Sequence, residues 1–197
     1  MLKNLFNERK AAQAAAYFLF RAGEPLSVLK LTKLLYLAER RSFEKFGEPM
    51  IGDHPVSMPH GPVLSTTYDH VNGMIASSEG GWETWIADRE EHILDLRDRD
   101  AIQSAESLLE LSEADLEVLG ETWSQFGAMD QWQLRDWTHE HCHEWRDPEG
   151  SSVPIQFEDL FAALAFSRAQ SDAILARLRE TDAISGALGV GARPERG

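Results

Sequence analysis

The sequence predicts a mainly α-helical (α+β) fold, consisting of a single helical domain with a small β-hairpin insertion. Several long segments carry apolar residues at helical spacing, and β-prone runs occur in one short region only. No internal repeat and no interdomain linker divides the 197 residues. We therefore expect one domain over residues 1–182, followed by a disordered tail of small residues at 183–197.

Two helices are expected in the first quarter of the chain. The alanine-rich segment 8–22 predicts the first helix, which Gly23 ends. Ser27 is placed to cap the second helix, and Gly47 ends it. One face of this second helix has apolar residues at i, i+3, i+4 and i+7: Leu31, Leu34, Leu35 and Ala38. Such a stripe predicts burial of this face.

The middle of the chain is less regular. Residues 48–61 contain three prolines and two glycines, so we expect an irregular loop. Pro62 stands where a first helical residue favours proline and predicts a short helix that stops at Gly73. Two β-prone runs, 82–87 and 92–97, predict the small hairpin.

Three further helices are expected in the second half. Ser112 and Asp115 form a capping-box pattern in front of a helix over 113–126. Asp130 is placed to cap the next helix, which must end before Pro148. Residues 157–180 predict one long amphipathic helix.

Composition narrows the class of partner. The chain has 33 Asp and Glu against 19 Lys and Arg, a formal net charge of −14. Such a surface repels phosphate backbones and anionic lipids, so neither a nucleic acid nor a membrane is expected as partner. A basic protein is the electrostatic complement, although many soluble proteins are equally acidic. No apolar run reaches the length of a membrane span, and we expect a cytoplasmic protein.

The segment His139-Glu140-His141-Cys142-His143 matches the H-E-x-x-H pattern of zinc proteases. On a helix it would place His139 and His143 on one face. A catalytic zinc site also needs a third protein ligand, and neither Arg146 nor Glu149 supplies the glycine and histidine of an extended motif. We therefore expect no metal and no other cofactor. His139 and His143 remain weak metal candidates, and a zinc-dependent hydrolase remains the alternative from the enzyme class.

Four short motifs occur in a fixed order along the chain. They lie at Lys30–Ala38, at Gly47–Met50, at His60–Val63 with Tyr68 after it, and at Leu134–Glu140 with Trp145 after it. Together, over about residues 8–170, they resemble the Panacea domain, the SocA-like antitoxin family of bacteria and their phages. The chain departs from the family pattern at Thr32, where glutamine is common, and before Trp145, where a proline is usual.

The resemblance implies a binding function without catalysis. Members of this family neutralise a cognate toxin protein, usually encoded by the adjacent gene. The simplest route is occlusion of the toxin by direct protein–protein binding. The alternative is an adaptor that delivers the toxin or another client to an ATP-dependent protease.

The candidate partner-binding residues come from the motifs and from the tryptophans between them: Lys33, Tyr36, His60, Trp137, Thr138, His139 and Trp145. Each also has a structural interpretation. Tyr36 can flank the core with its hydroxyl bonded, Lys33 can be solvated, and His60 can shape a turn. Thr138 and His139 can tie down a loop. Trp137 shares a face with Leu134 and is expected towards the core, whereas Trp145 is expected to be an exposed anchor.

Overall fold

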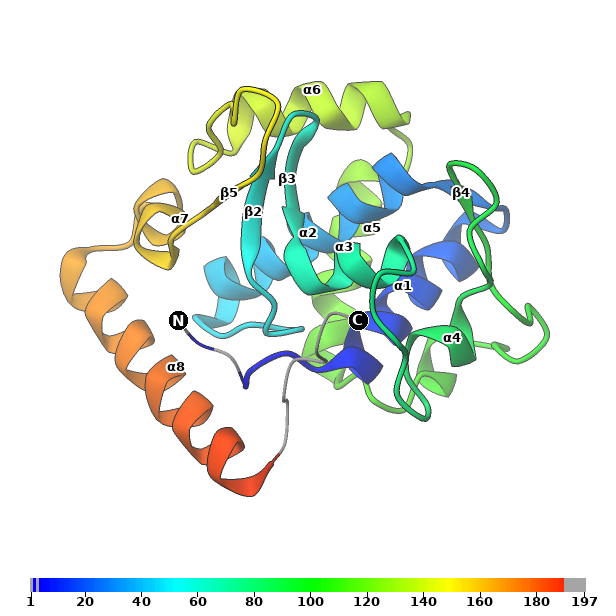
Figure 1. Ribbon diagram of the computed structural model, residues 1–197, viewed down its shortest axis with the longest axis horizontal. Helices are drawn as coiled ribbons and strands as arrows, with labels where there is room; N and C mark the ends of the chain where they lie inside the picture. The colour runs from blue at the N-terminus through cyan, green and yellow to red at the C-terminus, as the bar shows by residue number, and fades with distance from the viewer. Residues whose placement is uncertain (1, 3, 190–197) are drawn as a thin grey trace.

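The computed structural model describes residues 2 and 4–189 and is mainly α-helical, with two small β-sheets (Figure 1). The helices are α1 (Glu8–Ala22), α2 (Val28–Phe46), α3 (Ser65–Val71), α4 (Trp82–Trp85), α5 (Glu113–Phe126), α6 (Gln131–His141), α7 (Phe157–Ala163) and α8 (Arg168–Leu188), with a 3₁₀ turn at Ala105–Ser107. The strands are β1 (Leu26–Ser27), β2 (Pro55–Met58), β3 (Gly61–Leu64), β4 (Ile93–Leu94) and β5 (Val153–Pro154). The predicted fold class is confirmed.

Helix α2 is the centre of the molecule. It contacts α1, α5, α6, α3 and β3. The Ser27 side chain accepts a hydrogen bond from the Lys30 amide, and Gly47 ends the helix in the left-handed conformation at φ 66°. The predicted stripe of Leu31, Leu34, Leu35 and Ala38 is completely buried. Sequence periodicity and capping residues thus predicted the central element correctly.

The main hairpin lies where a loop and a helix start were predicted. Strands β2 and β3 pair antiparallel from Pro55 opposite Leu64 to Met58 opposite Gly61, and β5 adds to the other edge of β2. The expected irregular loop is therefore confirmed for residues 48–54 and wrong for the hairpin residues after them, and the helix start at Pro62 is wrong, since α3 begins at Ser65. Pro62 is tolerated because β3 is an edge strand, where one side of the backbone needs no ladder hydrogen bonds.

The hairpin predicted over 82–97 forms only in part. Residues 82–85 make the helical turn α4, and β4 pairs with β1 instead of with the first predicted run. An isolated antiparallel bridge between Ile86 and Leu96 is what remains of the expected pairing. The strand prediction was correct for Ile93 and Leu94, but their partner strand is the distant β1, at Leu26–Ser27.

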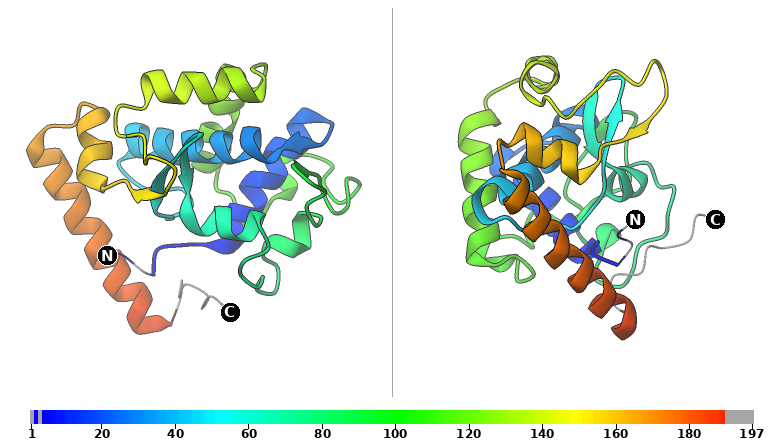
Figure 2. Two further views of the ribbon diagram at one scale, coloured as in Figure 1. Left: turned by 45° about the horizontal axis from the view of Figure 1, so that its top comes forward. Right: turned by 90° about the vertical axis from the view of Figure 1, so that its left-hand side faces the viewer.

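The predicted long helix over 157–180 is divided in two. Ala165 adopts a left-handed φ of 59°, and Ser167 caps a new helix by accepting a hydrogen bond from the Gln170 amide. Helix α8 then runs along the outside of the molecule, beside α7 and the N-terminal segment (Figure 2). It continues to Leu188, so residues 183–188 of the expected tail are helical, and residues 190–197 lie outside the described residues.

Two apolar clusters hold these elements. The larger one lies between α1, α2, α5 and α6, and the smaller one joins Phe43 of α2 to α7 and α8. No helix among the described residues is long and apolar enough to span a bilayer.

Candidate binding site

Lys33 is buried between α2 and the hairpin. Only 1% of the residue is exposed, and its Nζ donates a hydrogen bond of 2.8 Å to the Pro62 carbonyl. Among the described residues no carboxylate oxygen lies within 4.0 Å of this ammonium group. Burial lowers the pKa of Lys33 to about 7. The expectation that Lys33 is solvated was wrong, because the sequence does not show that the hairpin covers it.

Gly61 lets the hairpin tip approach this lysine closely. Its φ is +96°, and a Cβ atom at this position would lie 2.7 Å from Thr138 Oγ1 and 3.0 Å from Lys33 Cε. Thr138 is fully buried and donates its own hydroxyl to the Arg135 carbonyl. The tip is thus held between α2 and α6 with no space for a side chain.

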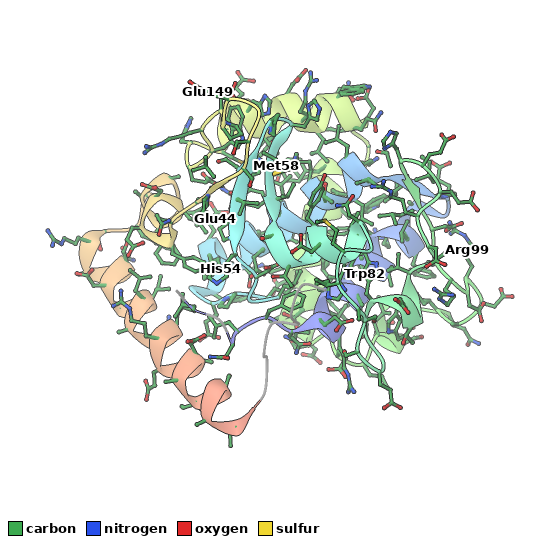
Figure 3. All side chains as sticks on the ribbon, in the orientation of Figure 1. Glu44, His54, Met58, Trp82, Arg99 and Glu149 are labelled. Atoms are coloured by element: carbon green, nitrogen blue, oxygen red, sulfur yellow. The ribbon has the colours of Figure 1, made fainter. Side chains whose placement is uncertain are left out.

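Trp145 fixes the other side of the tip. Its ring stacks on His139 with centroids 4.0 Å apart, and its Nε1 donates to the Met58 carbonyl at 3.0 Å. Met58 lies at the end of the hairpin beside α6 (Figure 3). Trp145 is partly buried, so the prediction of an exposed anchor at this position is wrong. Burial and the neighbouring Lys33 ammonium lower the pKa of His139.

Tyr36 anchors the segment that follows α6. Its hydroxyl donates a 2.5 Å hydrogen bond to Glu144 Oε1, which also accepts from Arg40 Nε at 2.8 Å. The Glu144 side chain is completely buried. Burial and the adjacent Glu144 carboxylate raise the pKa of Tyr36. The prediction that the Tyr36 hydroxyl is bonded is confirmed, whereas Glu144 was not recognised from the sequence.

Glu39 supports the loop that leads into the hairpin. Its carboxylate accepts backbone hydrogen bonds from Met50, Ile51 and Gly52 at 2.9, 2.7 and 2.8 Å. Burial raises the pKa of Glu39 to about 7. A glutamate directly after the first motif, on the buried side of α2, was a signal that could have identified it.

An open cavity of about 390 Å³ lies on the outer side of Lys33. Its walls come from the start of α2, the hairpin tip, α3, the 89–92 loop and the first turn of α6. His60 and Trp132 stand at this cavity, and Trp132 is 50% exposed. Trp132 was not among the predicted binding residues, although it is the tryptophan that faces outward.

The predicted site residues therefore separate into groups. Lys33 and His60 line the cavity. Behind it, a buried polar clamp holds the hairpin tip and the chain after α6, and it consists of Lys33, Tyr36, Thr138, His139, Glu144 and Trp145. Trp137 lies elsewhere on α6, packed on Phe126 and His141 towards the core, as predicted from its helical face.

The zinc-protease pattern does not form its helical face. Helix α6 ends at His141 with Cys142 as its C-cap, so His143 lies beyond the helix. His139 stacks on Trp145, and the described residues contain no group of three or more His, Cys, Asp or Glu side chains that could hold a metal ion. The geometry required for the zinc-hydrolase alternative is therefore not present in the segment that suggested it.

One comparison with known proteins finds a family match for the chain. The sequence model of the family described as "Antitoxin SocA-like, Panacea domain" matches residues 31–146, more than half of the chain. This range contains the hairpin, the buried polar clamp and Trp132. No curated protein and no solved structure matches the chain.

Proposed function

Because this chain belongs to the SocA-like antitoxin, Panacea domain family, we propose that it neutralises a protein toxin by binding it directly. The family match carries this proposal and agrees with the resemblance drawn from the four motifs. We expect the toxin to be encoded by the adjacent gene. The proposed role requires a binding surface and no catalytic group.

The rim of the cavity is the surface that best fits this role. Trp132 is a large aromatic side chain with half of its surface exposed, and the Arg135 guanidinium lies 5.0 Å from its ring centroid. Tryptophan and arginine are enriched among the residues that dominate binding energy at protein interfaces. His60 and Pro59 of the hairpin tip line the same cavity as Trp132. We therefore assign the partner contact to the first turn of α6 and the hairpin tip.

The buried polar clamp positions this rim rather than touching the partner. Tyr36 and Thr138 are buried, and Trp145 is hydrogen-bonded to the hairpin backbone. Substitutions at these positions should therefore reduce the amount of folded protein. Substitution of Trp132 should instead weaken binding and leave folding intact.

Co-expression with the neighbouring gene tests the proposal. We expect the neighbour alone to arrest growth, and we expect this chain to restore growth and to co-purify with the neighbour's product. Trp132→Ala should raise the dissociation constant at least tenfold, a loss of about 1.4 kcal/mol or more. Leu109→Ala is the matched control, because Leu109 is 86% exposed on the segment before α5. Equal binding of the toxin by both variants would show that the cavity rim is not part of the interface. A neighbouring gene product that is harmless and does not bind this chain would show that it is not the cognate toxin.

The same experiment separates occlusion from delivery to a protease. Under occlusion, the toxin accumulates with this chain in a stable complex. Under delivery, growth recovers while the toxin disappears, and deletion of residues 183–197 abolishes the effect if that segment is the tether. Rescue that survives the deletion with an undiminished toxin level is the result we expect.

A further inference from the structure

The cavity outside Lys33 has the dimensions of a small-molecule site. Its volume of about 390 Å³ lies within the range of about 300–1,000 Å³ that is usual for ligand pockets. Five separate segments of the chain form its walls, so its shape is set by the fold rather than by one mobile loop. Four of its lining residues are already fixed in place by α2, where they occupy the first two turns.

The charge of this cavity is opposite to that of the molecule. Its lining includes Lys33, Arg89, His60 and His92, and no Asp or Glu. The protein as a whole has a formal net charge of −14. Acidic residues flank Arg89 in the sequence, at Asp88 and Glu90, but neither lines the cavity. The lining of this cavity therefore carries no carboxylate, although the molecule as a whole is rich in Asp and Glu.

The lysine and the arginine at this cavity lack anionic partners among the described residues. Lys33 makes its hydrogen bond with a neutral carbonyl, that of Pro62, and Arg89 donates at 2.6 Å to the neutral side-chain oxygen of Asn72. No ion pair of either residue is present within 4.0 Å among the residues that the structure describes. Removing a lysine from water without a counter-charge is costly, and an anion bound beside it would offset that cost.

The remaining walls are mainly apolar. Trp132, Tyr68 and Met58 line the cavity together with the apolar start of α2. Aromatic and thioether side chains bind planar ligands well, because they offer large contact areas at low entropic cost. The lining of the cavity thus combines cationic and aromatic side chains.

We propose that this cavity binds a small planar organic anion, with its ring against Trp132 and its anionic group towards Lys33 and Arg89. The ligand class is an aromatic carboxylate or an aromatic phosphate ester. This role does not depend on toxin neutralisation, and it can be tested on the isolated protein.

Isothermal titration calorimetry with matched probes tests the proposal. Indole-3-acetate represents the carboxylates and 1-naphthyl phosphate the phosphate esters, and indole-3-acetamide and 1-naphthol are their uncharged counterparts. We expect at least one anion to bind with a submillimolar dissociation constant and its neutral counterpart to bind at least tenfold more weakly. The stronger of the two anions identifies the ligand class.

Two variants locate the binding. Arg89→Gln removes an exposed guanidinium and should weaken the anion at least tenfold, while Arg168→Gln, at an exposed position on α8, should have no effect. Lys33→Met should also weaken it, provided that circular dichroism shows a folded protein. In the wild-type protein, the anion should shift the Trp132 indole N–H resonance. Absence of anion binding at millimolar concentration, equal binding of the neutral probes, unchanged binding by Arg89→Gln, or an unmoved Trp132 resonance would each overturn the proposal.

Discussion

At the scale of single residues, Gly61 decides how closely the hairpin tip can approach the helices. An alanine here would need a φ of +96° and would bring its Cβ to 2.7 Å from Thr138 Oγ1. We expect Gly61→Ala to lower the free energy of unfolding by about 2–4 kcal/mol, from backbone strain together with overpacking. Chemical denaturation measures this change.

Gly150→Ala is the control for the backbone contribution alone. Gly150 has a similar φ of +87°, but no heavy atom lies within 4 Å of the position of its added Cβ. We expect this substitution to cost only about 1–2 kcal/mol. An equal loss in both variants would mean that the tip is not closely packed against Thr138 and Lys33.

Glu39 gives the protein a defined dependence on pH. Its pKa is raised to about 7 in the folded state, against an ordinary value of 4.5, because it is buried. The folded state therefore holds the proton more tightly, so the stability from this group is greatest below pH 4.5 and is lost as the pH rises through 7.

Comparison with Glu39→Gln isolates this group, because glutamine does not titrate. The free energy of unfolding of the wild type, measured relative to Glu39→Gln, should increase as the pH falls from 7.5 to 5. The slope should not exceed about 1.4 kcal/mol per pH unit. A difference that stays constant over this range would mean that Glu39 ionises at an ordinary pKa.

The chemistry of the site was only partly predictable residue by residue. The motif positions Lys33 and His139 do come together at the hairpin tip, and Tyr36 lies on the same helix as Lys33. Their buried roles depend on partners distant in sequence, such as Glu144, which lies 108 residues from Tyr36. Trp132 and Trp145 both lie outside the stripe of α6, and only the position of the hairpin determines which of them is covered.

At the scale of elements, helices were predicted more accurately than strands because their signals are local. The caps at Ser27, Ser112 and Asp130 all accept the expected backbone hydrogen bonds. Strand pairing depends on distant segments, and so β1 with β4 and β2 with β5 were not foreseen. Proline content also concealed β2 and β3, since prolines at a strand start and on an edge strand are compatible with pairing.

The division between α7 and α8 supplies a prediction at this scale. The Ser167 hydroxyl accepts a hydrogen bond from the backbone amide of Gln170 and donates one of 2.8 Å to Gln170 Oε1. Ser167→Ala should lower the free energy of unfolding by about 1 kcal/mol, because the first turn of α8 loses its cap. Ser124→Ala, in the interior of α5 where the hydroxyl bonds only to its own helix, should change stability by less than about 0.5 kcal/mol. Denaturant titrations of both variants measure this difference, and equal values would exclude a capping role.

At the scale of the whole molecule, the two ends of the described chain stabilise each other. The backbone amide of Asn4 donates a hydrogen bond of 2.7 Å to the Asp182 carboxylate, and the side-chain amide of Asn4 donates to the backbone carbonyl of Asp182. Leu2 and Leu5 pack on the smaller apolar cluster that also holds α8. The sequence predicted a single domain but gave no signal for this contact, because it joins residues 178 positions apart.

Asp182→Ala should loosen both segments at once. Hydrogen exchange should become faster at the Asn4 amide and in the second half of α8, and we expect about 1 kcal/mol of local protection to be lost. Asp172→Ala is the control, because Asp172 is exposed on the same helix. Faster exchange in α8 alone, with Asn4 unchanged, would show that the two segments are independent.

This contact also constrains the order in which tertiary contacts can form during synthesis. Asn4 is translated 178 residues before Asp182. Helices α1 and α2 can form as they emerge, because their caps lie within their own sequence. The contact of the segment in front of α1 with Asp182 can therefore form only after α8 has been made, whereas the contacts of the same segment with Ile51 and His54 are available much earlier.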